Sequence, residues 1–244
     1  MALTEEIIDA LVEKYIKPDS ILAFGTSNDA EVFLKKIALK LQDPEHHLEN
    51  VSIVPTSSHI ATILSSVHIP IADINAREID VAVEFVDLVD HHFNYIKRDS
   101  LSLVRDKMIA QSAAEMIAIV EEKNFVKRLA GVIPFEIAIF GWKRSLVQLE
   151  ALGKAKLRMK GGQPYKTETN HYIIDVEVDE IYSLEDLEFE SKNIPGVLEA
   201  GLFIGYADRI LAHGKSGLKV KSRMDYSKQD DEDTVEMTEG LLTL

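Results

Sequence analysis

The chain has 244 residues, of which 46% are apolar and 28% charged, as in soluble globular proteins with a sizeable core. It has no cysteine, which excludes disulfides, thiol catalysis and zinc–thiolate sites. Its 27 Lys and Arg stand against 41 Asp and Glu, and a net charge of −14 disfavours nucleic acid and anionic membranes as partners. No apolar run reaches the roughly 18 residues of a membrane helix, and the N-terminus does not resemble a signal peptide, so we expect a cytoplasmic protein.

The first half of the sequence alternates predicted strands with predicted helices. Thr4 can cap the first helix, and Pro18 ends it. The strands are expected at 20–25, 50–55, 69–74, 79–85 and 116–120, and further helices at 31–41, 56–67 and 100–115. This alternation predicts a parallel sheet with helices on both faces.

After Pro134 the order of predicted elements changes to β-α-β-β-α-β, the order of a ferredoxin-like domain. The expected elements are a strand at 135–141, a helix at 143–152, strands at 154–160 and 171–181, a helix at 183–196 and a strand at 197–205. A last strand, 207–214, is expected to return to the first domain. We therefore predict an α/β fold with a Rossmann-like domain (1–132 and 206–224), a ferredoxin-like α+β domain (133–205) and a flexible acidic tail (225–244).

A first polar cluster, Gly25-Thr26-Ser27-Asn28-Asp29, follows the first predicted strand and precedes a helix. This arrangement points free backbone N–H groups at an anion, because the first amides of a helix have no partner within it. An ordinary turn in which Asn28 or Asp29 caps the helix is an equally simple interpretation.

A second cluster, Glu84, Asp87, Asp90, His91 and His92, follows the predicted strand 79–85. Acids and histidines of this kind can bind a metal, form a solvated loop, or orient sugar hydroxyls by accepting hydrogen bonds. The pattern alone leaves these alternatives open.

A third cluster combines positive charge with an acid at the start of a helix. Lys97 and Arg98 come just before Ser100 and Ser102, either of which can begin the helix, and Asp106 falls in its early turns. The helix dipole favours a carboxylate there. A water-exposed pairing on the helix surface remains the alternative.

The order and spacing of these clusters resemble type A ribose-5-phosphate isomerases from about residue 3 to residue 222. The family's Gly-Thr-Gly-Ser-Thr, Asp-Gly-Ala-Asp-Glu, Lys-Gly-Gly-Gly and Thr-Arg-Glu-Lys motifs correspond to residues 25–29, 84–88, 97–100 and 104–107. The stretches 194–197 and 201–203 are also similar to the family's second domain.

The resemblance implies an aldose–ketose isomerase that needs no cofactor and no metal and acts on a sugar phosphate through an enediolate. It implies Asp106 as general base, Lys97 as the group that stabilises negative charge on oxygen, and Glu84 and Asp87 as residues that hold hydroxyls. The implied substrate-binding residues are Gly25, Thr26, Ser27, Asn28, Asp29, Arg98, Asp99, Ser100 and Lys123. A homodimer or homotetramer is also implied.

Several positions depart from the family pattern. Asp106 replaces a Glu, which retracts the carboxylate by about 1.5 Å. Glu84 replaces an Asp, which extends its side chain by the same length on the opposite wall of the site. Residues 85 and 98–100 carry side chains where the family has glycine, and Asp29 brings a negative charge toward a phosphate. At about 4 Å such repulsion is about 4 kcal/mol per charge pair at an effective dielectric of 20. Two functions stay open: an isomerase with altered geometry, and a catalytically silent sugar- or metabolite-binding protein.

Overall fold

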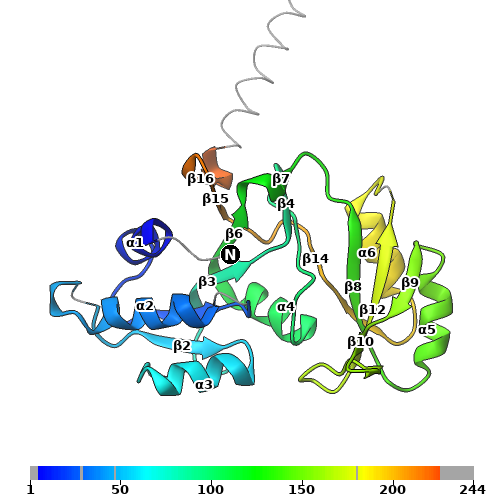
Figure 1. Cartoon of the computed structure of the whole chain (residues 1–244), viewed down its shortest axis with the longest axis horizontal. Coiled ribbons are helices and arrows are strands. Elements are labelled where there is room, and N and C mark those ends of the chain that lie inside the picture. Colours follow the sequence, from blue (N-terminus) through cyan, green and yellow to red (C-terminus); the bar gives the residue numbers. More distant parts are fainter. Residues whose placement is uncertain (1–4, 28–29, 47, 180, 226–244) are drawn as a thin grey trace, which may run out of the picture.

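The computed structural model describes residues 5–27, 30–46, 48–179 and 181–225 (Figure 1). The helices in this part of the chain are α1 (Glu5–Lys14), α2 (Ala30–Gln42), α3 (Ser58–Ser66), α4 (Leu103–Ser112), α5 (Trp142–Leu149) and α6 (Leu184–Lys192), with 3-10 turns η1 (Pro44–His46) and η2 (Glu122–Asn124). The strands are β1 (Ile21–Phe24), β2 (Ser52–Pro55), β3 (Ile79–Phe85), β4 (Leu88–Asp90), β5 (Tyr95–Ile96), β6 (Ala113–Glu121), β7 (Phe125–Val126), β8 (Gly131–Ile137), β9 (Lys154–Leu157), β10 (Met159–Lys160), β11 (Gln163–Pro164), β12 (Tyr172–Val178), β13 (Val197–Ala200), β14 (Leu202–Phe203), β15 (Arg209–Gly214) and β16 (Gly217–Ser222).

The largest sheet has the order β16-β15-β6-β3-β1-β2, and all its neighbours pair in parallel except β15 and β16. The chain leaves β1 toward β2 at one edge and then returns to β3 on the other side of β1. The strand order therefore reverses between β1 and β3. In open parallel sheets, ligands bind in the crevice outside the carboxyl ends of the strands at such a reversal.

Helices cover both faces of this sheet, as the sequence predicts. The strand β1 is buried along its whole length because its side chains alternate between two cores. Leu22 and Phe24 pack in the core that includes α1, α2 and α3, whereas Ile21 and Ala23 pack in the core that includes α4.

A second sheet, antiparallel, has the order β13-β8-β12-β9, with α5 between β8 and β9 and α6 between β12 and β13 (Figure 1). This is the ferredoxin-like arrangement, so the predicted fold class is confirmed. A small sheet, β14-β5-β4-β7, joins the two halves of the chain. The division into two domains, 1–132 with 206–224 and 133–205, stays a prediction, since β14 of the second range pairs with β5 of the first.

Some predicted elements differ from the structure. The predicted strand 69–74 is wrong: only an isolated bridge joins Ile71 to Ile53, and Pro70 has no amide to donate. The helix predicted to reach residue 115 ends at Ser112, because the parallel pairing with β3 already begins at Ala113. The strand predicted at 197–205 breaks at Gly201 into β13 and β14.

The alternating stretch that forms β16 was not predicted, and neither were the short strands β4, β5 and β7. Thr4 and the acidic tail beyond Asp225 lie outside the described residues. Among the helices that are described, none has the length and apolar character to span a membrane.

Candidate active site

The loops that follow β1 and β2 meet through hydroxyl groups. The Thr26 hydroxyl donates to Ser57 Oγ at 3.0 Å and lies 3.4 Å from the hydroxyl of Thr56. The Thr56 hydroxyl in turn donates to the Phe24 carbonyl at 2.8 Å. Because parallel strands end at the same edge, Thr26 and Thr56 are neighbours at the carboxyl edge, although they lie 30 positions apart in the sequence.

Glu84 lies on β3 next to its carboxyl end, packed against Gly25. A Cβ at position 25 would lie 1.7 Å from Glu84 Oε1, so only glycine leaves room for this carboxylate. The same oxygen accepts a hydrogen bond from the Phe85 amide at 3.0 Å and one from the Lys97 ammonium group. The one glycine of the first polar cluster thus makes room for a neighbouring carboxylate.

Lys97 is fully buried between two carboxylates. It pairs with Glu84, and its Nζ lies 3.5 Å from Asp106 Oδ2. Its amide donates to the Gly201 carbonyl at 2.9 Å, and a Cβ at 201 would lie 2.4 Å from the Lys97 carbonyl oxygen. A buried ammonium group is stable only when it is paired, and the two acids provide that pairing.

Asp106 lies in the first turn of α4, where the helix dipole favours its negative charge. Ser102 caps this helix, its side chain accepting a hydrogen bond from the Arg105 amide at 3.3 Å. The Ser100 hydroxyl donates to Asp106 at 2.6 Å and accepts from the Ser102 amide at 3.0 Å. The loop before α4 therefore fixes one oxygen of the Asp106 carboxylate.

The cluster Glu84–Lys97–Asp106 is buried, and burial shifts its proton equilibria. Burial raises the pKa of Glu84 to about 7, although the Lys97 charge opposes this shift and the Asp106 charge adds to it. Burial likewise raises the pKa of Asp106, against the effects of Lys97 and Ser100. Burial disfavours the charged amine, yet the charges of Asp106 and Glu84 outweigh it and raise the pKa of Lys97. The cluster therefore holds an exchangeable proton near neutral pH.

Two other residues of the predicted site have partners of their own. The Asp87 carboxylate accepts the Arg98 amide at 2.6 Å. The Arg98 guanidinium donates to the carbonyls of Ala130 at 3.2 Å and Val132 at 2.9 Å. Arg98 therefore fixes the start of β8 and does not neutralise charge at the loop after β1.

The remaining predicted substrate-binding residues lie at the periphery or outside the described residues. Lys123, in η2 after β6, is paired with Glu121 at 2.7 Å, and its side chain is 73% exposed. Asp99 is exposed, and the Ser27 carbonyl accepts the Ala30 amide at 3.2 Å. The two residues outside the described ranges are Asn28 and Asp29. The roles of all these residues in binding substrate stay predictions.

The acid- and histidine-rich run after β3 forms a turn. The buried Asp90 carboxylate accepts the amides of His92 at 2.9 Å and Asn94 at 3.0 Å, and the side-chain amide of Asn94 at 3.0 Å. The ring of His91 packs against Phe125. Within the described ranges, no group of three or more His, Asp or Glu side chains forms a set of metal ligands.

Two buried polar groups near the cluster were missed by the sequence analysis. Glu136 is fully buried on β8, and the lone acid in the apolar run 133–137 was the available signal. The Tyr95 hydroxyl is buried without a hydrogen-bond partner in the part of the chain that the structure describes. Burial raises the pKa of Tyr95 well above its usual value, and the charges of Glu84 and Asp106 add to this effect.

Glu168, from the segment before β12, was also missed. Its carboxylate accepts the Ser58 amide at 2.9 Å and the Ser58 hydroxyl at 2.6 Å, at the N-terminus of α3. It also pairs with Arg105 of α4 at 2.5 Å. Glu168 thus joins the starts of two helices of the parallel-sheet half to a segment of the ferredoxin-like half.

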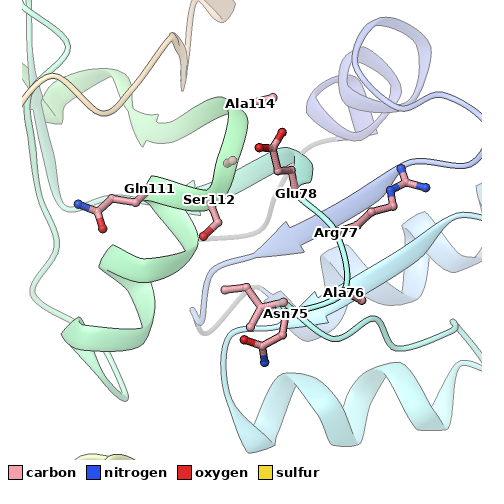
Figure 2. Close-up of a pocket in the computed structure, with 9 residues that line it drawn as sticks. Asn75, Ala76, Arg77, Glu78, Gln111, Ser112 and Ala114 are labelled. Atoms are coloured by element: carbon pink, nitrogen blue, oxygen red, sulfur yellow. The ribbon is translucent and has the colours of Figure 1, made fainter.

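A separate hollow of about 670 Å³ lies at the opposite end of the parallel sheet (Figure 2). Figure 2 shows Arg77 and Glu78 just before β3, and Gln111 and Ser112 at the end of α4. None of the predicted site residues lines this hollow. The polar cluster at the carboxyl edge remains the candidate active site.

Comparison with known proteins identifies the family. An open parallel sheet with helices on both faces and polar residues at the carboxyl ends of its strands places the chain in the class of α/β proteins that bind ligands at the strand-order reversal. The family model described as ribose 5-phosphate isomerase A (phosphoriboisomerase A) matches residues 52–217. The chain belongs to this family, so the resemblance seen in the sequence is confirmed.

Individual relatives agree with this result over most of the chain. A ribose-5-phosphate isomerase A from Prochlorococcus marinus subsp. pastoris is 32% identical and covers 84% of this chain and 90% of its own. A ribose-5-phosphate isomerase A from Pyrococcus horikoshii is 33% identical, and the match covers 86% of this chain and 93% of the relative. A solved D-ribose-5-phosphate isomerase, in complex with phospho-erythronic acid, superposes with a TM-score of 0.81 at 31% identity, covering 91% and 100% of the two chains.

The raised pKa of Glu84 predicts how stability depends on pH. The folded-state pKa of about 7 exceeds the ordinary value of 4.5, so the folded state binds this proton more tightly than the unfolded state. The stabilisation that the protonated Glu84 carboxyl gives the folded state is complete below pH 4.5 and is lost as the pH rises to about 7. We predict that the free energy of unfolding of the parent protein, minus that of Glu84→Gln, falls across this window in urea titrations.

The control is Glu31→Gln, since Glu31 is exposed and its hydrogen bond with Lys35 lowers its pKa. The corresponding difference for Glu31→Gln should not fall between pH 4.5 and about 7. A Glu84 difference that stays level or rises with pH would contradict the assignment of a raised pKa.

Proposed function

We propose that the chain interconverts ribose 5-phosphate and ribulose 5-phosphate, a step of the pentose phosphate pathway. The observation that carries this proposal is the buried Lys97 amine between the carboxylates of Glu84 and Asp106. Membership of the isomerase family and the isomerase activity named for relatives at 31% to 33% identity support it.

In the proposed reaction Asp106 removes the C2 proton of the open-chain aldose. The electrons of that C–H bond form the C1–C2 double bond, and the negative charge moves to O1. The Lys97 ammonium group stabilises this enediolate, because a fixed positive charge in a buried site interacts strongly with developing negative charge. Return of a proton to C1 gives the ketose when O1 gains a proton and the 2-hydroxyl loses one.

Glu84 suits this last exchange between the two oxygens. A group with a pKa of about 7 both accepts and releases a proton near neutral pH. Its carboxylate pairs with the same Lys97 amine as Asp106 does. We therefore assign proton exchange at the sugar hydroxyls to Glu84, with Asp87 as a further group that holds them.

The exchange of acid lengths is compatible with this chemistry. Asp106 is about 1.5 Å shorter than the Glu of the family pattern, and Glu84 is longer than the Asp by the same increment. Both carboxylates nevertheless reach the same amine. A substrate displaced toward α4 would meet both acids, so the altered lengths compensate each other.

The hydroxyl groups at the ends of β1 and β2 suit the phosphate end of the substrate. Thr26 and Ser57 present hydroxyls at the carboxyl edge, close to the backbone of Gly25. The solved relative in complex with phospho-erythronic acid binds a phosphorylated sugar acid, which supports a sugar phosphate as the substrate class here.

We also propose a cytoplasmic homodimer or homotetramer. Large apolar side chains on and near α5 and α6 support self-association, because exposed apolar surface favours an interface. Phe140 is 96% exposed, Val147 60% and Phe189 70%.

Light scattering of the purified chain should give a mass of two or four chains. The double substitution Phe140→Ser with Phe189→Ser should lower this mass. A parent protein that stays a monomer at micromolar concentration would contradict the proposed oligomer.

Substitutions at position 106 test the proposed reaction. We predict that Asp106→Asn loses at least about 1,000-fold in kcat, since no carboxylate remains to remove the C2 proton. Asp106→Glu should keep measurable activity, because it keeps a carboxylate within reach. A coupled assay of ribulose 5-phosphate formation measures both.

The matched control is Asp80→Asn, which changes a carboxylate near the amino end of β3 that accepts the Ile21 amide at 2.7 Å. This variant should retain the parent kcat. A parent protein that binds ribose 5-phosphate but forms no ribulose 5-phosphate at high enzyme concentration contradicts the proposal and favours the silent binding protein.

A further inference from the structure

Glu136 is a fully buried acid on the central strand β8 of the antiparallel sheet, yet its partners include the first turn of α4. Its Oε2 accepts the Val104 amide at 3.0 Å, and the Ser102 hydroxyl lies 3.3 Å from the same oxygen. A buried carboxylate that accepts a free amide at a helix N-terminus stabilises that terminus through both the hydrogen bond and the helix dipole.

The other oxygen of Glu136 holds a different segment. Thr167 donates to Oε1 at 2.8 Å, Thr169 also donates to it, and His171 Nδ1 lies 3.0 Å away. These three residues belong to the segment that leads into β12. One carboxylate therefore connects the ferredoxin-like sheet, this segment and the helix that carries the proposed base.

A short chain of contacts leads from Glu136 to Asp106. The Ser102 side chain contacts Glu136, and the Ser102 amide donates to Ser100 Oγ at 3.0 Å. The Ser100 hydroxyl donates to the Asp106 carboxylate at 2.6 Å, and the Asp106 amide donates to the Ser102 carbonyl at 3.0 Å. Any shift of Ser102 would therefore move the Asp106 carboxylate.

We propose that Glu136 is a positioning residue for the isomerase reaction, which holds the first turn of α4 so that Asp106 faces Lys97. This inference rests on the proposed function, because it concerns the base of that reaction. Glu136 lies outside the Glu84–Lys97–Asp106 cluster and holds α4 through its first turn and the serines before it. The ferredoxin-like half thus takes part in catalysis through one buried charge.

The charge of Glu136 also acts on Asp106 directly. After burial, which raises the pKa of Asp106 most, the negative charge of Glu136 is a further cause that raises it. Hydrogen bonds from Thr169, Val104 and Thr167 outweigh the burial of Glu136 itself and lower its pKa, so it is ionised at neutral pH. The titratable and charged groups around this helix start include Glu84, Tyr95, Lys97, Arg105, Glu136, Tyr165, Glu168 and His171.

The test compares Glu136→Gln with Glu136→Asp. In Glu136→Gln the NH2 group of the side chain faces other hydrogen-bond donors, so the first turn of α4 moves. We expect kcat to fall about 10- to 100-fold while KM changes less than about 3-fold. Removal of the charge also lowers the pKa of Asp106, so the acid limb of the kcat profile should move to lower pH. Glu136→Asp keeps the charge but not the reach, so kcat should fall with the acid limb unmoved.

Asp208→Asn is the matched control, because Asp208 accepts a backbone amide outside α4, that of Met116 in β6, at 2.8 Å. It should leave kcat, KM and the pH profile at parent values. Thr169→Val, which removes one donor to Glu136 and keeps the charge, gives a second variant should Glu136→Gln fail to fold; it should lower kcat without moving the acid limb.

A folded Glu136→Gln with parent kcat and an unmoved acid limb would overturn the inference, as would a folded Thr169→Val with parent kcat. The failure of the proposed function is a different outcome, in which the parent protein itself has no isomerase activity. The pKa of Asp106, measured by NMR of labelled carboxyl carbons, then still tests the effect of Glu136 on Asp106. This pKa should be lower in Glu136→Gln than in the parent, and equal values would overturn the inference.

Discussion

The site depends on one constraint: a fully buried ammonium group must be neutralised by fixed carboxylates. Lys97 satisfies this constraint with Glu84 from β3 and Asp106 from α4. Three segments of the chain must therefore converge at the carboxyl edge of the parallel sheet, and the fold provides this through the strand order and through Gly201, whose backbone approaches Lys97 directly. In the proposed reaction, this positive charge stabilises the negative charge that develops on the substrate without reorganisation of solvent.

The two halves of the chain contribute to the site in different ways. The parallel-sheet half supplies the proposed reacting groups and the hydroxyls of the loops after β1 and β2. The ferredoxin-like half supplies carboxylates that hold helix starts: Glu136 at α4 and Glu168 at α3. Because helix N-termini carry unpaired amides and partial positive charge, the carboxylates at these points fix the helices in a protein whose net charge is −14.

Much of the architecture could be predicted from the sequence because apolar periodicity decides which residues face a core. The alternation of strands and helices indicated the parallel sheet, and the β-α-β-β-α-β order indicated the second sheet. The predicted strand at 69–74 was wrong because apolar residues around Pro70 pack without a ladder of hydrogen bonds. The break at Gly201 could not be seen either, since it depends on the distant backbone of Lys97.

For the site, sequence spacing predicted that Lys97 and Asp106 lie close to the start of one helix. It could not predict the partners of either side chain. Arg98 illustrates this, because its carbonyl partners lie more than thirty residues away, at and just before β8. Glu136 was missed for the same reason: its five donors come from two separate segments. Long-range polar pairing follows from the assembled fold and leaves little trace in local pattern.

The most direct measurement is a crystal structure of this chain with phospho-erythronic acid. We predict that the compound's carboxylate lies within hydrogen-bond distance of Lys97 Nζ, between Glu84 and Asp106, with its phosphate at the Thr26 loop. A complex in which the compound occupies another surface, or in which Lys97 stays enclosed by protein while the phosphate binds elsewhere, would contradict the central claim that this buried amine is the centre of the site.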